Sequence, residues 1–269
     1  LFRSVPAPPV IEFDQEGNVV QAWGGDGTGF DWPKQEHGIR IVGDTVLLGG
    51  NHKDDGFLLK FTRDGKFIKQ LGKPGPRKGD QDTGQLGQPA DFWVDSSANE
   101  LYVADGYGNH RIIVFDSNTF TYKRHWGAYG KVPEPELNPT SSDPGGHAYN
   151  PAGPVPQTFN NPVHCVKIAD DGLVYVCDRT NDRLQVFRKD GTYVTEWTYE
   201  PSTLGAGAVC GEHGWQRRAI CGMAGQQRVG HQPQGGVHVR QGQEGEGAEA
   251  GGRARHKLGE IIVEAPGEV

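Results

Sequence analysis

The chain has few methionines, few cysteines and no long apolar segment, and the last two shortages each exclude a class of protein. Its 269 residues include 1 Met and 4 Cys, and four cysteines are too few for a disulfide framework in a chain of this length. No apolar run approaches the roughly 20 residues that a membrane helix needs, so we expect no membrane span. The formal net charge of -7 at pH 7 provides no basic surface, so we expect no nucleic-acid partner.

Glycine, in contrast, is abundant at 41 residues, and four segments of the chain repeat one pattern. Each segment has a Phe, a polar turn that usually ends in Gly, and an alternating strand that ends on Trp or Leu. Such segments are typical of β-hairpins with one buried face. The segments span residues 10–24, 58–72, 112–127 and 184–198, with anchors Phe13 and Trp23, Phe61 and Leu71, Phe115 and Trp126, and Phe187 and Trp197.

A second unit of two short strands precedes three of these segments, and two hairpins together make a four-stranded blade. A period of about 50 residues is typical of β-propellers. We therefore predict an all-β propeller arc over residues 1–204, with a Pro- and Gly-rich insertion loop at 131–158. The blades are expected near residues 10–24, 37–72, 89–127 and 162–198.

Two blades carry an Asp, then an Asn, then an Arg immediately before the third strand, in DGYGNHRIIVFD (105–116) and DRTNDRLQVF (178–187). With this signature the chain resembles the NHL-repeat family of six-bladed β-propellers. We expect the polar residues to tie turns and blades together by hydrogen bonds. They are Asp105, Asn109 and Arg111 in one blade, and Asp178, Asn181 or Asp182, and Arg183 in the other.

Residues 2–198 also resemble the lyase domain of the peptidylglycine α-amidating monooxygenase family, most specifically in QPADFWVDSSANELYVADGYGNHRIIVF (88–115). The resemblance implies cleavage of peptidyl-α-hydroxyglycine to a peptide amide and glyoxylate. It further implies a zinc ion on three histidines, a catalytic Tyr and Arg, a structural calcium ion, and a secreted or periplasmic location.

The resemblance assigns the catalytic roles to Tyr107, in the Asp-Gly-Tyr sequence, and to Arg3, in LFRS. A cation beside a phenol favours its deprotonated form, so the Tyr could act as a general base. The Arg would offset the negative charge that develops during the reaction.

For the metal, the resemblance assigns His164 in NPVHCV to one zinc-ligand position. At the position that it implies for the first zinc ligand, the chain has Gly56, and His52 lies four residues earlier. His238 is the candidate for the third ligand. A three-histidine site is therefore incomplete at the expected positions.

The last quarter of the chain does not continue the repeat. From residue 200 to 269 there is no Phe, Tyr, Asp or Asn, and Gly, Gln, Arg, Glu and Ala dominate. This composition predicts a low-complexity, disordered segment over 205–269. The simultaneous loss of four residue types suggests a sharper hypothesis, namely out-of-frame translation of further blades.

Two functions stay open on the sequence. The chain is related to amidating lyases, with a peptide or small-molecule substrate and zinc-dependent carbon–nitrogen cleavage, and the incomplete ligand set predicts that it is inactive as written. The alternative is a non-catalytic propeller that binds a protein or a ligand, because fold alone does not determine function. Cys165 and Cys177 flank one turn, so they could face each other across a hairpin, but a one-residue change in turn length would put them on opposite faces. We expect two unbonded, half-buried thiols.

Overall fold

The computed structural model describes residues 7–133 and 150–198 and two short strands, 208–211 and 220–223. Apart from these two strands, the predicted low-complexity segment lies outside the described residues. Arg3 and His238 also lie outside them. In the part of the chain that is described, no helix has the length and apolarity that a membrane crossing requires.

The strands form antiparallel sheets in chain order. The first sheet, blade 1, is the hairpin of β1 (Val10–Phe13) and β2 (Val19–Trp23). Three four-stranded sheets follow, each with its strands paired in sequence. They are blade 2, with β3 (Glu36–Val42), β4 (Thr45–Gly50), β5 (Phe57–Thr62) and β6 (Phe67–Gly72); blade 3, with β7 (Asp91–Asp95), β8 (Glu100–Asp105), β9 (Arg111–Asp116) and β10 (Tyr122–Trp126); and blade 4, with β11 (Val163–Ile168), β12 (Val174–Asp178), β13 (Arg183–Phe187) and β14 (Tyr193–Thr198).

Short elements complete the description. One 3-10 turn, η1 (Ala128–Gly130), follows blade 3, and another, η2 (Arg179–Asn181), joins β12 to β13. Beyond blade 4, β15 (Ala208–Gly211) and β16 (Ile220–Met223) pair as a hairpin beside β11 and β12. This hairpin lies within the stretch whose composition predicts no ordered structure.

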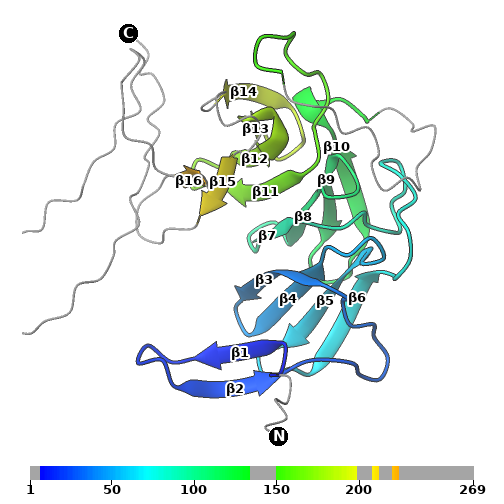
Figure 1. Cartoon of the computed structure of the whole chain (residues 1–269), viewed down its shortest axis with the longest axis vertical. Coiled ribbons are helices and arrows are strands. Elements are labelled where there is room, and N and C mark those ends of the chain that lie inside the picture. The colour runs from blue at the N-terminus through cyan, green and yellow to red at the C-terminus, as the bar shows by residue number, and fades with distance from the viewer. Residues whose placement is uncertain (1–6, 134–149, 199–207, 212–219, 224–269) are drawn as a thin grey trace, which may run out of the picture.

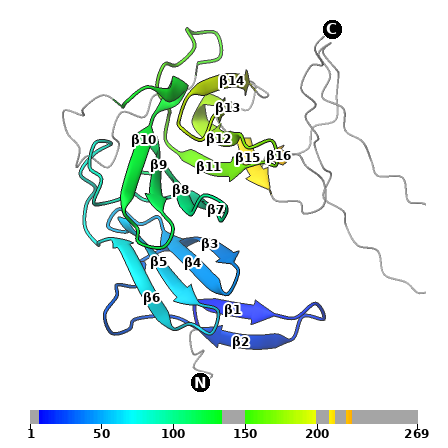
Figure 2. The ribbon, with the colours of Figure 1, turned by 180° about the vertical axis from the view of Figure 1, so that it is seen from behind.

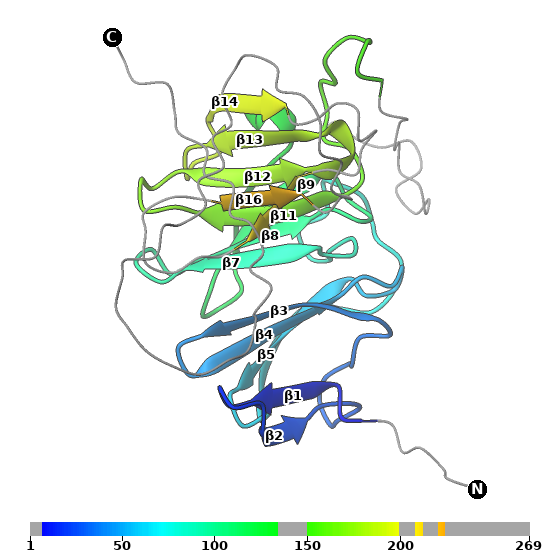
Figure 3. The same ribbon diagram turned by 60° about the vertical axis from the view of Figure 1, so that its left-hand side comes forward.

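The sheets succeed one another along an arc (Figure 1). The first strands of the full blades adjoin, because β7 contacts both β3 and β11, and Figure 3 shows these three strands side by side. Seen from behind, the last strands of blades 2 and 3, β6 and β10, form the edges of their sheets opposite β3 and β7 (Figure 2). The predicted all-β fold with propeller-like sheets is confirmed; the described residues form an arc of blades in which no closed ring is seen.

Apolar side chains fill the spaces between successive blades. One core cluster joins Leu47 and Leu58 of blade 2 to Phe92 and Leu101 of blade 3. A second cluster unites blades 3 and 4 and includes Trp126, from β10. Burial of these side chains stabilises the contacts between successive blades, although apolar burial itself has little directional character.

Three of the four predicted Phe anchors are buried. Phe61, Phe115 and Phe187 are each at most 1% exposed. The prediction for Phe13 is wrong, because this side chain is 56% exposed. Blade 1 has only two strands among the described residues, so its sheet offers too little neighbouring surface to cover Phe13.

In blade 3 the Asp-Asn-Arg signature forms a buried hydrogen-bond network. Asp105 accepts from Gly87 N at 2.6 Å, Asn109 Nδ2 at 2.7 Å and Arg111 Nε at 2.9 Å. The guanidinium then donates to the carbonyl oxygens of Asp80 and Gln85. The ion pair therefore ties the loop that enters the blade to the second and third strands.

Blade 4 repeats this network. Asp178 accepts from Asn160 N at 2.9 Å, Asn181 Nδ2 at 2.8 Å and Arg183 Nε at 2.7 Å. Arg183 also donates to the carbonyl oxygen of Thr158, in the loop that enters the blade. The same residue types thus make the same connections in two blades, and the Asp side chains are fully buried in both.

The expectation of free thiols is wrong, because Cys165 and Cys177 form a disulfide between β11 and β12. A register shift between Val163 and Cys165 places the two cysteines directly opposite each other, with Cα atoms 5.0 Å apart. Side-chain direction in a strand pair depends on register to a single residue, and a bulge of this kind is not visible in the sequence.

We expect removal of this bond to destabilise blade 4. It closes a loop with a sequence separation of 12 residues, for which the chain-entropy relation gives about 3 kcal/mol. The Cys165→Ala/Cys177→Ala variant should lose that amount of unfolding free energy in urea denaturation. A variant as stable as the wild type would show that the bond does not constrain the unfolded chain.

A second ion-pair group joins blade 3 to blade 4. Arg124 donates to both carboxylate oxygens of Glu100, at 2.8 and 2.6 Å, and to Lys189 O at 2.8 Å in blade 4. The Arg124 hydrogen bonds lower the pKa of Glu100 to about 2, assisted by the Tyr102 hydroxyl and against the opposing effect of burial.

This pKa predicts a pH-dependent stability difference between the wild type and Glu100→Gln. The folded-state pKa lies below that of the unfolded chain, so the stabilisation is complete above about pH 4.5. It should shrink as pH falls from there towards about 2. Urea denaturation of both proteins between pH 7 and pH 3 measures the difference; a constant difference would contradict this assignment.

Candidate functional site

Three ring side chains from different elements converge at one end of the blades. His37 is the second residue of β3, Tyr107 follows β8, and His164 is the second residue of β11. The ring centroids are 5.2 Å apart for His37 and Tyr107, 5.9 Å for Tyr107 and His164, and 6.3 Å for His37 and His164. His37 is exposed and the other two are half-buried, so the cluster is open to solvent.

The hydrogen bonds of His37 define its tautomer. Nδ1 lies 3.0 Å from the carbonyl oxygen of Ala90, which can only accept, so Nδ1 carries the proton. In the neutral ring Nε2 is then an acceptor, and the Tyr107 hydroxyl lies 3.3 Å from it. The ring is therefore held through Nδ1, and the lone pair of Nε2 is turned towards the cluster. Metal-binding histidines commonly have this arrangement.

His164 has a buried nitrogen atom without a partner. Within the described residues, Nδ1 of His164 makes no hydrogen bond, which is uncommon for a buried polar atom. Burial, followed by the charges of Arg179 and His37, lowers the pKa of His164 to about 4, although Asp91 opposes the shift. The ring is therefore neutral at pH 7, the form that can bind a metal ion.

A guanidinium lies beside this cluster. Arg179 is the first residue of η2, and its guanidinium carbon is 5.8 Å from the centre of the Tyr107 ring. Its backbone N–H donates to Pro162 O, which ties the start of η2 to the residue before β11. The cluster thus combines a cation, a phenol and two imidazoles.

Close backbone packing holds Tyr107 in place. A Cβ atom on Gly106 would lie 2.0 Å from Val163 O, so only glycine allows this approach of blade 3 to blade 4. Asn161 Nδ2 donates to Tyr107 O at 2.7 Å from the other side of the same contact. The residue type at position 106 therefore determines whether Tyr107 can lie beside His164.

The structure places the other predicted ligands elsewhere or does not describe them. The Nδ1 atom of His52 accepts from Asp54 N at 3.2 Å, so this ring is engaged in the turn after β4. At Gly56 a Cβ atom would lie 2.8 Å from Leu86 O, which leaves no room for a ligand side chain. Arg3 and His238 lie outside the described residues.

The cluster contains two imidazoles, a side-chain type that can act as a metal ligand. Imidazole nitrogens suit zinc, but among the described residues no group of three or more His, Cys, Asp or Glu side chains could hold a metal ion. A catalytic zinc site uses three protein ligands. His37 and His164 therefore fit two ligand positions, and a third ligand would have to come from outside the described residues.

Sequence reasoning missed His37 and Arg179, although the repeat contained a signal for each. His37 and His164 stand at the same place in their blades, at the start of the first strand in HGIRIV and HCVKI. Arg179 directly follows Asp178, just as Gly106 and Tyr107 follow Asp105. Comparing the blades with one another would have placed all four side chains at the same end of their blades.

Comparison with known proteins agrees with this architecture. The family model described as NHL repeat matches residues 86–115. NHL repeat-containing protein 3 of Mus musculus is 28% identical over 199 residues, which cover 71% of this chain and 48% of that protein, and the Homo sapiens protein of the same name is also 28% identical. The chain spans about half the length of these relatives.

Part of the chain is also similar to an amidating enzyme. Peptidyl-glycine alpha-amidating monooxygenase B of Xenopus laevis is 34% identical over 110 residues, which cover 40% of this chain and 10% of that protein. The chain is thus an all-β protein of propeller-like blades that carries an NHL repeat. Its resemblance to the NHL-repeat family, which includes a distant similarity to amidating enzymes, is confirmed.

We expect Gly106→Ala to separate blades 3 and 4 at the cluster. The added methyl group would overlap the backbone of Val163, and overpacking of this kind costs about 1–3 kcal/mol. Thermal unfolding followed by circular dichroism measures the loss. Gly84→Ala is the control, because its Cβ atom would meet nothing nearer than Asp82 Oδ1 at 3.8 Å; equal midpoints for the two variants would contradict the prediction.

Proposed function

We propose that this chain carries the centre of a carbon–nitrogen lyase of the amidating type, which cleaves peptidyl-α-hydroxyglycine to a peptide amide and glyoxylate. The observation that carries the proposal is the convergence of His37, Tyr107 and His164, with Arg179 beside the phenol. The partial similarity to an amidating monooxygenase supports the same reaction class.

His37 and His164 would hold zinc, together with a ligand from outside the described residues. The orientation of the His37 ring and the unpartnered Nδ1 of His164 support this role. A bound zinc ion lowers the pKa of a hydroxyl group that it coordinates. The neutral state of His164 means that no proton has to be displaced from it at pH 7.

Tyr107 is the candidate for proton transfer, because its hydroxyl lies 3.3 Å from His37 Nε2 and its ring lies beside both His164 and Arg179. As a phenolate it would accept the proton of the substrate hydroxyl while the carbon–nitrogen bond breaks. The same oxygen would then return the proton to the leaving amide nitrogen, so a single residue serves as base and acid. Arg179 lies over the ring and offsets the negative charge of the phenolate.

A non-catalytic binding role is the second candidate, and one observation favours it. Among the described residues only two imidazoles, those of His37 and His164, belong to the cluster, one fewer than the three protein ligands of a catalytic zinc site. The similarity to NHL repeat-containing protein 3 also covers more of the chain than the similarity to the amidating enzyme. In this case the open cluster would bind a ligand or a protein segment without turnover.

Glyoxylate release from a peptidyl-α-hydroxyglycine, measured together with zinc content, separates the two candidates. The lyase proposal predicts bound zinc and turnover, and Tyr107→Phe should lower kcat by about 10²- to 10⁴-fold, the usual contribution of general acid–base catalysis. Tyr122→Phe is the matched control, because its hydroxyl contacts His125 on the outer strand β10. Wild-type protein without zinc and without turnover would refute the lyase proposal and favour the binding role.

A further inference from the structure

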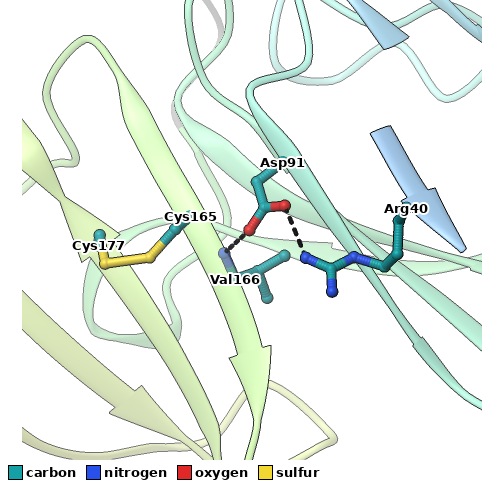
Figure 4. The surroundings of a disulfide bond; sticks show 5 residues. All are labelled: Arg40, Asp91, Cys165, Val166 and Cys177. Carbon is teal, nitrogen blue, oxygen red and sulfur yellow. Dashed lines mark hydrogen bonds and ion pairs between the residues drawn. A yellow bond between two sulfur atoms is a disulfide. The ribbon is translucent and has the colours of Figure 1, made fainter. Parts of the chain in front are cut away.

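One carboxylate connects the first strands of three blades. Asp91 is the first residue of β7, which lies between β3 and β11. Its Oδ1 accepts from Arg40 Nη2 of β3 at 3.1 Å, and its Oδ2 accepts from Val166 N of β11 at 3.2 Å. Figure 4 shows the side chain of Asp91 between these two partners.

The strands that Asp91 connects are those that hold the two histidines. Arg40 is three residues after His37 on β3, and Val166 is two residues after His164 on β11. The His37 ring itself bonds to Ala90 O, the residue before Asp91. Asp91 therefore contacts each of the two strands within three residues of its histidine.

These links are directional, unlike the apolar contacts between the blades. The side chains of Arg40 and Asp91 are 13% and 21% exposed, so solvent screens their ion pair less than it would a surface pair. A charge-assisted hydrogen bond has a narrow range of length and angle. Asp91 therefore adds polar contacts with defined partners on both β3 and β11 to the apolar packing of the blades, and Arg40 Nε also donates to Phe92 O on β7.

The disulfide extends this connection to the fourth member of the cluster. Cys165 lies between His164 and Val166, and Cys177 lies two residues before Arg179. Their bond joins β11 to β12 beside the Asp91 link (Figure 4). The backbone that holds His164 is thus bonded on one side to Asp91 and on the other to the strand that leads to Arg179.

We propose that Asp91 is a positioning residue that sets the distance between His37 and His164, and thereby the affinity of the cluster for a divalent metal ion. This inference rests on the proposed function. Asp95, on the same strand, provides a matched control, because its Oδ2 also bridges two blades, with Lys189 Nζ at 2.5 Å, but at the other end of β7.

Zinc titration by calorimetry, with zinc ion alone as the probe, tests the proposal on the full chain. Asp91→Ala should weaken zinc binding at least about tenfold, while Asp95→Ala should stay within about twofold of the wild type, since only the first bridges the histidine strands. Asp91→Asn should lie between them, because the amide oxygen still accepts from Val166 N but the ion pair with Arg40 is lost. Should Asp91→Ala fail to fold, Asp91→Asn decides.

A measurement on the metal-free protein keeps this inference separable from the lyase proposal. NOEs between the His37 and His164 rings, whose centroids are 6.3 Å apart, should persist in Asp95→Ala and weaken or vanish in both Asp91 variants. Unchanged NOEs in the Asp91 variants overturn the inference, as does unchanged zinc affinity. If the wild type binds no zinc, the lyase proposal and the proposed effect of Asp91 on metal affinity are both wrong. The role of Asp91 in spacing the two histidine strands is still supported in that case if the NOEs weaken in the Asp91 variants and persist in Asp95→Ala.

Discussion

The buried pair of an Asp at the end of the second strand and an Arg at the start of the third organises blades 3 and 4. Asp105 with Arg111 and Asp178 with Arg183 are almost completely removed from solvent, which is costly for charged groups unless every oxygen and N–H finds a partner. Both carboxylates meet this requirement with three hydrogen bonds each. Each buried pair therefore holds the loop that enters the blade and the turn between the second and third strands in one fixed arrangement.

The candidate site depends on the same pairs. Tyr107 lies two residues after Asp105, and Arg179 directly follows Asp178, so each buried carboxylate fixes the backbone from which one of these side chains extends. The histidines come from the first strands, whose spacing we assign to Asp91. The cluster is thus built from residues at equivalent places in successive blades. Repetition of one structural unit brings different chemical groups together at the same end of these blades.

The sequence was sufficient for the fold because a hairpin repeat is a local pattern. Phe61, Phe115 and Phe187 could be recognised as buried anchors from their spacing to the following turn, whereas Phe13 has the same pattern in a two-stranded sheet and is exposed. The disulfide could not be predicted, because one register shift between Val163 and Cys165 decides which face the cysteine occupies.

The site was only partly predictable for a related reason. Tyr107 and His164 were recognised from motifs, but motif matching directed attention to His52, whose ring belongs to a turn, and away from His37. The arrangement of the blades along the arc decides which strand starts lie close together. This becomes visible only when the blades are superposed on one another. His238 and Arg3, outside the described residues, stay as predictions.

The central claim is that His37, Tyr107, His164 and Arg179 form one ligand-binding centre. Anomalous scattering at the zinc absorption edge, from crystals of the full chain grown with zinc, tests it directly. The account predicts a peak about 2 Å from ring nitrogens of both His37 and His164, within reach of the Tyr107 hydroxyl. A zinc peak elsewhere, with both rings unliganded, or no peak at all, would contradict it.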